Sequence, residues 1–270
     1  MMKKKQVISN NSLPYTLATI LSVLLLIVII FYSIGYRLNG FSLTHTGSLL
    51  ITTNISGTKI FIDNSKKGTL KDGDAELFVR QISPGNHTAL VATENYWPWT
   101  KEVFINPKQT TEIHPFMFLR ENIPQIVEIG NTDFEKALYN IYNYSLPSLY
   151  IPIKSKSENV SLWVDKNIIY AEWIGPKEKA PYYFCQSDTC DPLVTSVINP
   201  VTDIRNIGFY GDRDDVVLFS LEDGVYAIEI DRTNTQNFQP VYKGTDIRFV
   251  TKDAHTIYIK EGNTLKSLAI

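Results

Sequence analysis

The sequence contains little of what most enzymes and nucleic-acid-binding proteins depend on. Its 270 residues include four histidines and two cysteines, and the formal net charge at pH 7 is −2. Nearly balanced charge gives no clustered positive field for a phosphate backbone, so we expect no nucleic-acid partner. The sequence also lacks a nucleophile elbow, a zinc-protease helix motif, a P-loop and a dinucleotide fingerprint. We therefore identify no catalytic residue, and we expect no metal ligand and no cofactor.

Charged side chains are absent from residues 6–36, and within this span residues 17–34 are almost wholly apolar. A helix needs roughly 20 such residues to cross the hydrocarbon core of a bilayer, where it satisfies its own backbone hydrogen bonds. Lys3, Lys4 and Lys5 precede the span, whereas Arg37 stands alone after it. Because positive residues concentrate on the cytoplasmic side, we predict a cytoplasmic tail at 1–14, a transmembrane helix at 15–36 and an extracytoplasmic remainder.

A cleaved secretory signal is the alternative to a retained anchor, since it also begins with lysines and an apolar run. The apolar part of such a signal is usually about 7 to 15 residues long, which is shorter than the run in this sequence. Ser33-Ile34-Gly35 matches the small-residue cleavage pattern poorly. We therefore predict a single-pass anchor, followed at 37–47 by an irregular linker of small and polar residues.

Residues 48–118 alternate between apolar runs of strand length and clusters of Gly, Pro, Asn or Asp, at a spacing of roughly ten residues. No helical period of 3.6 residues competes with this pattern. Flat and β-branched side chains, which are abundant here, fit a pleated and half-buried surface. The pattern predicts a small antiparallel β-sandwich. The expected strands are 49–51, 59–63, 77–82, 87–92, 101–105 and 111–117.

Several motifs in this region resemble the PEGA domain, a small β-sandwich common in bacterial envelope and surface proteins. They are a Val-Tyr-Val-Asp-like strand at 60–63, Gly68-Thr69, Pro84-Gly85 followed by Asn86-His87, and Asn95-Tyr96 at a Gly-Tyr position. The tetrapeptide that names the family falls on residues 55–58, where Gly57 is retained. The resemblance implies a binding or spacer module that brings no catalytic residues with it.

Turn geometry explains why these positions hold the residues they do. We expect Gly57, Gly68 and Gly85 to adopt turn conformations that are costly for other residues, and Pro84 to preset φ at the entrance of its turn. Asn95 tolerates the left-handed region that a glycine would occupy. These residues therefore have structural roles in our interpretation.

Tyr96-Trp97-Pro98-Trp99 is the most conspicuous local feature of the region. Three aromatic rings around a proline could form an exposed surface that stacks on a sugar or a peptide, because planar rings give large contact area at low entropic cost. The alternative, which we favour, is that the rings fill one end of the small sandwich. Tyr96, Trp97 and Trp99 are nevertheless the candidate binding residues of the chain.

Residues 119–270 contain an approximate repeat of β-rich segments. Units that begin near residues 160, 204 and 247 are 44 and 43 residues apart, which is the period of a four-stranded propeller blade. Closed propellers need about four blades or more, yet two full units and a partial third are visible. The preceding segment could supply a further blade, the sheets could stay open, or another molecule could complete them. Open strand edges would favour homo-oligomers. Residues 133–143 are spaced like a short amphipathic helix that Asp133 could cap.

Cys185 and Cys190 flank a four-residue loop at the tip of an apparent hairpin. Residues in such positions lie close enough for a disulfide, and an extracytoplasmic compartment permits oxidation. Free thiols and, less favoured, a metal site are the alternatives. Asp212, Asp214 and Asp215 could gather around calcium, but the spacing of an EF-hand is missing, so we expect solvated turns.

Together these observations predict an all-β chain with one N-terminal transmembrane helix, a PEGA-like sandwich at 48–118 and a partial β-propeller-like region at 119–270. The function we expect is non-enzymatic: the bilayer holds residues 15–36, and the outer region binds a protein or cell-wall partner of the envelope. A propeller-borne enzyme of the glycosidase or lyase class is one alternative. A membrane sensor subunit is the other, although its cytoplasmic tail would be very short.

Overall fold

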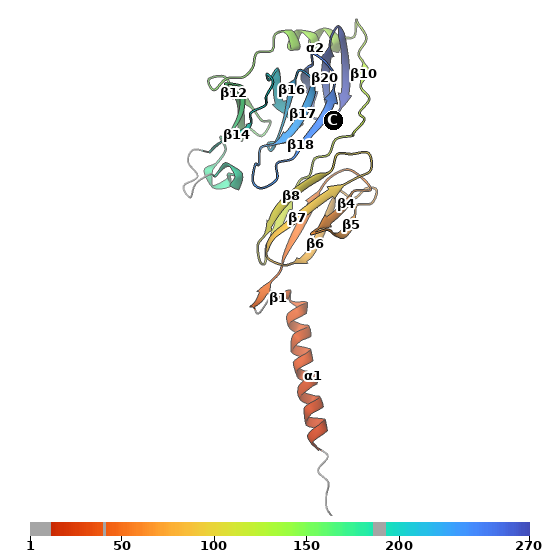
Figure 1. The fold of residues 1–270 in the computed structure, drawn as a ribbon, viewed down its shortest axis with the longest axis vertical. Helices are drawn as coiled ribbons and strands as arrows, with labels where there is room; N and C mark the ends of the chain where they lie inside the picture. The colour runs from red at the N-terminus through yellow and green to blue at the C-terminus, as the bar shows by residue number, and fades with distance from the viewer. Residues whose placement is uncertain (1–11, 40–41, 186–192) are drawn as a thin grey trace, which may run out of the picture. The chain divides into compact units, whose positions relative to one another are not determined.

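The computed structural model describes residues 12–39, 42–185 and 193–270, which form two compact units. Unit 1 runs to Thr52 and includes Glu76–His87 and Val103–His114, and unit 2 comprises Thr53–Ala75, Thr88–Glu102 and Pro115–Ile270. Apart from helices α1 and α2 and two short 3₁₀ turns, the regular structure of the described residues is β-sheet (Figure 1). The predicted fold class, mostly β with one N-terminal apolar helix, is confirmed.

Helix α1 (Ser12–Ser33) contains a stretch, Tyr15–Ser33, that is long and apolar enough to cross a membrane, and none of that stretch is buried within the protein. Three of its hydroxyl side chains are satisfied within the helix. Thr19, Ser22 and Ser33 each donate a hydrogen bond of 2.8 Å to the carbonyl oxygen four residues earlier. Because a free hydroxyl is costly in hydrocarbon, these bonds suit the helix to an apolar environment.

The segment expected to be an irregular linker forms a β-hairpin instead. Strand β1 (Tyr36–Asn39) pairs antiparallel with β2 (Ser42–His45). A segment of small and polar residues shows no apolar alternation, so this pairing was not recognisable from the sequence.

A three-stranded sheet completes unit 1. Strand β3 (Gly47–Thr52) is its centre and pairs antiparallel with β6 (Glu76–Ile82) and parallel with β9 (Thr110–Ile113). The sheet is therefore mixed, whereas the sequence pattern predicted antiparallel pairing throughout. Alternation along a strand reports which face is buried but not the direction of its neighbours, so the sequence could not reveal the parallel pair.

The helix and this sheet are joined by Arg37. Its guanidinium lies 3.4 Å from the centroid of the Tyr32 ring and donates to the Tyr32 carbonyl at 2.9 Å and to Gln81 Oε1 at 2.5 Å. Gln81 has a φ of +61° and lies where the pairing of β3 with β6 shifts register. An extra residue at such a bulge redirects a side chain, and here the redirected amide accepts from Arg37.

Residues of the PEGA-like region also form a four-stranded sheet, in the order β5-β4-β7-β8. The strands are β4 (Lys59–Ile62), β5 (Ser65–Thr69), β7 (Gly85–Ala92) and β8 (Trp99–Ile105). Gly57 and Gly85 have positive φ values of +73° and +122°, Asn95 has +65°, and Pro84 immediately precedes β7. Gly68 lies within β5 rather than in a turn, because Asp63 and Asn64 make the turn between β4 and β5 with φ values of +50° and +63°.

Unit 2 continues with three four-stranded antiparallel sheets, ordered β11-β12-β13-β14, β15-β16-β17-β18 and β10-β21-β20-β19. The strands of the first are β11 (Ile153–Lys154), β12 (Val160–Asp165), β13 (Ile168–Trp173) and β14 (Val194–Ile198). Those of the second are β15 (Asn206–Phe209), β16 (Val216–Leu221), β17 (Gly224–Glu229) and β18 (Phe238–Lys243). Those of the third are β10 (Gln125–Ile126), β19 (Arg248–Asp253), β20 (Thr256–Glu261) and β21 (Thr264–Ala269).

The sequence repeat was aligned one strand out of step in its first unit. It matched β12, which is an inner strand of its sheet, with β15 and β19, which are edge strands. The edge strand that corresponds to them in the first sheet is β11. The corresponding edge strands β11, β15 and β19 begin at residues 153, 206 and 248, so the spacing from β11 to β15 is longer than that from β15 to β19. The extra length lies between β13 and β14 and carries the 3₁₀ turns η1 (Lys177–Lys179) and η2 (Tyr182–Phe184). The apparently partial third unit is completed by β10, which comes from before the repeat.

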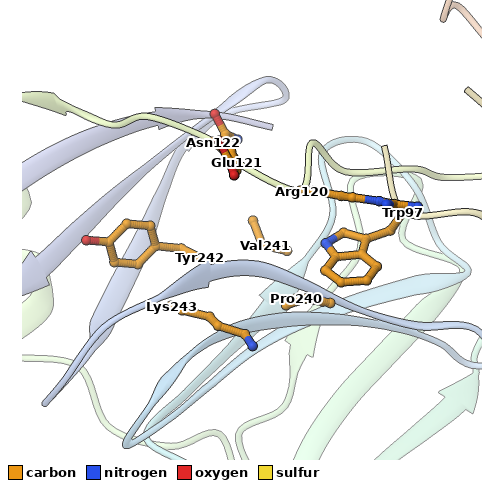
Figure 2. Close-up of a pocket in the computed structure, with 8 residues that line it drawn as sticks. All are labelled: Trp97, Arg120, Glu121, Asn122, Pro240, Val241, Tyr242 and Lys243. Carbon is orange, nitrogen blue, oxygen red and sulfur yellow. The ribbon is translucent and has the colours of Figure 1, made fainter. Parts of the chain in front are cut away.

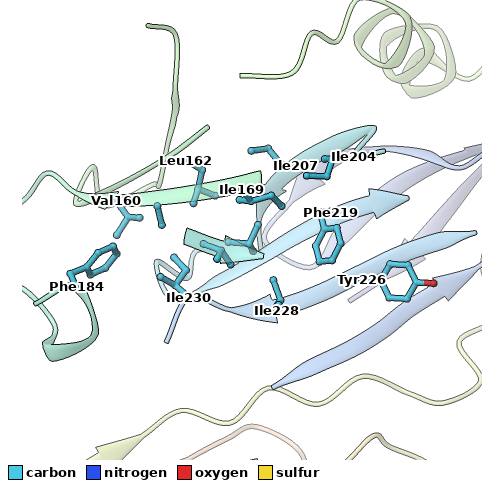
Figure 3. Packing of buried hydrophobic residues seen from close by; sticks show 13 residues of the cluster. Val160, Leu162, Ile169, Phe184, Ile204, Ile207, Phe219, Tyr226, Ile228 and Ile230 are labelled. Atoms are coloured by element: carbon cyan, nitrogen blue, oxygen red, sulfur yellow. The ribbon is translucent and has the colours of Figure 1, made fainter. Parts of the chain in front are cut away.

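A hydrophobic core of unit 2 lies between the first two of these sheets (Figure 3). Leu162 and Ile169 from one sheet and Phe219 and Ile228 from the other are at most 2% exposed. Full burial of each such side chain stabilises the fold by about 1.5–3 kcal/mol. A second cluster joins helix α2 (Thr132–Tyr142) to β20 and β21 through Phe134, Ala137, Ile141, Tyr258 and Leu265.

Helix α2 agrees with the predicted amphipathic segment, but its cap is a different residue. Asn131 is the N-cap, and its side chain accepts a hydrogen bond of 2.9 Å from the backbone N–H of Asp133. Asp133 lies inside the first turn, where its negative charge interacts favourably with the positive end of the helix dipole.

Candidate functional site

The three candidate aromatic residues lie in different environments. Tyr96 and Trp97 are half-buried, whereas Trp99 is 3% exposed and belongs to the core. The indole N–H of Trp99 donates to Glu229 Oε1, so this ring is fixed inside the protein. The structure therefore separates Trp99 from the other two and leaves Trp97 as the tryptophan of this group that a ligand can reach.

Trp99 is part of a buried cluster that joins β8 to the end of β17. Lys101 Nζ lies 2.9 Å from both Glu229 Oε2 and Asp231 Oδ2 and donates to the Asp231 carbonyl at 3.1 Å. The side chains of Lys101, Glu229 and Asp231 are 6%, 7% and 10% exposed. Sequence reasoning missed this cluster, because 128 residues separate Lys101 from Glu229.

Hydrogen bonds decide the charge state of Asp231. Burial alone would raise the pKa of its carboxyl group, but donation from Tyr182 and Lys101 and from the backbone of Thr233 holds that pKa below its ordinary value. Burial and the hydrogen bond to Asp231 raise the pKa of Tyr182. Asp231 is thus a carboxylate held ionised by its partners, which suits an ion pair better than a proton donor.

Two buried amide side chains reinforce the same junction. Asn237 accepts from the backbone N–H of Thr100 and donates to the Thr100 carbonyl, both at 2.9 Å. Gln239 accepts from the N–H of Phe118 at 3.1 Å and donates to the Phe116 carbonyl at 3.1 Å. These side chains satisfy backbone groups that would otherwise be buried without partners. Asn237 and Gln239 therefore hold the backbone at residues 100, 116 and 118 in place, and we call this hydrogen-bonded junction the frame.

A pocket of about 270 Å³ lies beside this frame (Figure 2). It is lined by Trp97, Arg120, Glu121, Asn122, Pro240, Val241, Tyr242 and Lys243. The backbone of its aromatic wall is held by two hydrogen bonds, from the Trp97 N–H to the Phe118 carbonyl at 2.9 Å and from the Arg120 N–H to the Asn95 carbonyl at 2.8 Å. Arg120 Nε donates to the Tyr96 carbonyl at 3.1 Å, and its guanidinium lies 5.3 Å from the centroid of the Trp97 ring.

A wider groove of about 660 Å³ follows residues 125–131 beside β10 and is less suited to a ligand. Two of its charged groups are paired with each other: Asp133 Oδ2 accepts from the Tyr258 hydroxyl at 2.7 Å and lies 2.9 Å from Lys252 Nζ. The hydrogen bond from Tyr258 and that from Lys252 hold the pKa of Asp133 below its ordinary value. These contacts connect the start of α2 to the third sheet.

The remaining sequence candidates lie elsewhere. Cys185 follows η2, but Cys190 falls outside the described residues, so the disulfide stays a prediction. Asp212 pairs with Lys156, and Asp215 pairs with Arg213 at 2.6 Å. These two aspartates are therefore engaged in ion pairs.

Comparison with known proteins identifies one region of the chain. Residues 46–117 match the family model of the PEGA domain, against the range of 48–118 expected from the motifs. None of the curated proteins compared with the chain matches it. The matched range contains Trp99 and Lys101, whereas residues 120–122 and 240–243 of the pocket lie beyond it. Residues 46–117 of this chain are a PEGA domain.

Proposed function

We propose that this chain is a non-enzymatic, single-pass membrane protein of the cell envelope that binds a cell-wall or protein ligand outside the cytoplasm. In this proposal α1 is the retained anchor, the N-terminus is cytoplasmic, and the three C-terminal sheets are blades of an incomplete propeller. The exposed apolar surface of α1, the lysines before it and the PEGA domain after it support this arrangement.

The observation that carries the proposal is the pocket at Trp97. It combines an aromatic ring, a guanidinium and an ammonium group on a frame that buried hydrogen bonds hold in place. A binding site needs such preorganised contacts, because side chains that are already fixed lose less entropy when a ligand binds.

Catalysis receives less support from the carboxyl groups. An acid catalyst working near neutral pH needs a raised carboxyl pKa. Four carboxyl groups of the described residues have a pKa shifted below the ordinary value: Asp133, Asp231, Asp253 and Glu261. This pattern favours a binding protein over a glycosidase or lyase.

Retention of the full-length chain on envelope material tests the proposal. The chain would be reconstituted in lipid nanodiscs and incubated with insoluble cell wall and, separately, with immobilised envelope proteins. We expect retention on one of these materials and loss of most of it in Trp97→Ala. Tyr150→Ala is the matched control, since Tyr150 is an aromatic residue outside the pocket that is 91% exposed. Absence of retention on both materials would contradict the proposed function.

Membrane orientation has a separate test. An epitope placed before Met1 is expected to bind antibody after permeabilisation of cells but not before it, and an epitope placed after Ile270 to bind antibody on cells whose outer barrier alone is opened. The reverse pattern would overturn the proposed orientation, and release of the chain from the membrane fraction would indicate cleavage of the N-terminal segment.

A further inference from the structure

The pocket at Trp97 presents mostly hydrogen-bond donors. Figure 2 shows the indole nitrogen of Trp97 on the side of the ring that faces Val241, and no described residue accepts from it. Arg120 uses Nε for the Tyr96 carbonyl, which leaves its two terminal nitrogens without an acceptor in the part of the chain that the structure describes. A ligand that fits these groups must supply several oxygen acceptors.

The charges around the pocket favour an anion. Arg120 and Lys243 are exposed and form no ion pair with any described residue, and Glu121 is the single acidic side chain of the lining. The nearby Tyr242 hydroxyl is already engaged by Glu261 and Lys266, at 2.9 Å each. A carboxylate matches the planar fork of a guanidinium, which can donate two parallel hydrogen bonds to it.

The floor and the size of the pocket favour a compact ligand with an apolar face. Trp97 and Pro240 provide apolar surface between the charged groups, whereas Val241 is 3% exposed. The volume of about 270 Å³ lies just below the ~300–1,000 Å³ of typical ligand pockets. A site of this size suits a single sugar ring, whose C–H face can lie against an aromatic ring while its hydroxyl oxygens accept hydrogen bonds at the rim.

We propose that this pocket binds a single sugar residue that carries a carboxylate, within a larger envelope polysaccharide or glycan. The proposal deepens the binding function above and rests on it. The sugar ring packs on Trp97 and Pro240, the carboxylate lies at the guanidinium of Arg120 with Lys243 adding positive charge to the lining, and the Trp97 indole N–H donates to a ring or hydroxyl oxygen.

The Trp97 indole proton gives a direct readout. The chain contains four tryptophans, so ¹⁵N-tryptophan labelling of the full-length chain in zwitterionic nanodiscs yields few indole signals, and Trp97→Phe assigns the relevant one. The probes are glucuronic acid, its neutral counterpart glucose, and acetate. We expect glucuronic acid to shift the Trp97 signal saturably, glucose to bind at least about tenfold more weakly, and acetate to leave the signal unmoved. A shift by glucose at the same concentration, or by acetate alone, would overturn the proposal.

Charge variants test the sign of the interaction without disturbing the frame. Lys243→Gln is expected to weaken glucuronic acid binding severalfold and Glu121→Gln to strengthen it, because both side chains are exposed and act by charge. Glucose binding should change in neither variant. Equal affinities for glucuronic acid in the two variants would contradict the proposed site. If the chain is retained on envelope material while no sugar moves the Trp97 signal, the binding function stands and the acidic-sugar assignment fails.

Discussion

At the scale of single residues, Lys101 is a position where substitution should strongly destabilise the fold. Its ammonium group neutralises Glu229 and Asp231 in a buried environment. Removing one partner of such a group leaves uncompensated buried charge, which costs more than the pair itself contributes.

Lys101→Met is therefore expected to lower the free energy of unfolding by about 3–5 kcal/mol. Lys156→Met is the matched control, because Lys156 and its partner Asp212 are 70% and 52% exposed, and such a surface pair contributes about 0–1 kcal/mol. Urea denaturation of the full-length chain, followed by tryptophan fluorescence, measures both. Similar losses in the two variants would show that burial of the cluster does not matter.

Stability should also depend on pH through Asp231. Its folded-state pKa is lower than the unfolded value of about 3.9. The folded state therefore binds a proton less readily, so this contribution is complete above the unfolded pKa and is lost as pH falls through the folded pKa. In Lys101→Met a lowering influence on that pKa is gone, so the gap between the folded and unfolded pKa narrows and the acid-induced loss of stability should be smaller than in the wild type. Denaturation midpoints between pH 3 and pH 7 measure the difference, and an equal or larger fall of the midpoint in Lys101→Met would contradict it.

At the scale of elements, the bulge in β6 connects helix α1 to the sheet formed by β3, β6 and β9. Gln81 adopts a left-handed φ that is costly for a residue with a side chain, and its amide accepts from Arg37. Arg37 also donates to a carbonyl of the last turn of α1, where its positive charge interacts favourably with the negative end of the helix dipole. The strain at Gln81 is thus associated with the link between helix and sheet.

Arg37→Ala is expected to increase amide hydrogen exchange in the β1–β2 hairpin by roughly 5- to 30-fold, which corresponds to about 1–2 kcal/mol of local opening. Arg80→Ala is the control, because Arg80 precedes Gln81 on β6 and its guanidinium lies over the Phe78 ring of the same strand. Exchange measured by mass spectrometry on the full-length chain in nanodiscs should leave the hairpin of the control unchanged. Equal protection in Arg37→Ala and the wild type would mean that the hairpin holds without this link.

At the scale of the whole molecule, the sequence predicted the kind of structure each segment forms better than which distant segments pair with one another. Residues 15–36 were recognisable by the absence of charge, and the PEGA domain by its turn residues. The parallel pairing of β9, the insertion of β10 into the last sheet and the cluster around Lys101 each join residues far apart in the chain. Local periodicity carries no information about such partners, so a single sequence could not reveal the pocket whose walls come from residues 97, 120–122 and 240–243.

The junction formed by Asn237 and Gln239 should make unit 2 unfold as one body. The double variant Asn237→Ala/Gln239→Ala leaves buried backbone groups of Thr100 and Phe118 without partners, at about 1–3 kcal/mol for each group. We expect amides at Trp99–Lys101 to exchange with the same opening free energy as those of β17 in the wild type and with a lower one in the variant. Unequal free energies already in the wild type would contradict a single cooperative body.

The position of β10 also has a consequence for how the protein is made. This strand ends at Ile126, yet the strand it pairs with, β21, begins at Thr264. During synthesis, the segment around β10 therefore emerges long before its neighbour exists, and its exposed isoleucines at 123, 126 and 129 stay without that partner strand for the interval. The last sheet can be completed only after residue 264 has been made, and until then β10 offers an unpaired strand edge of the kind that promotes association with other chains.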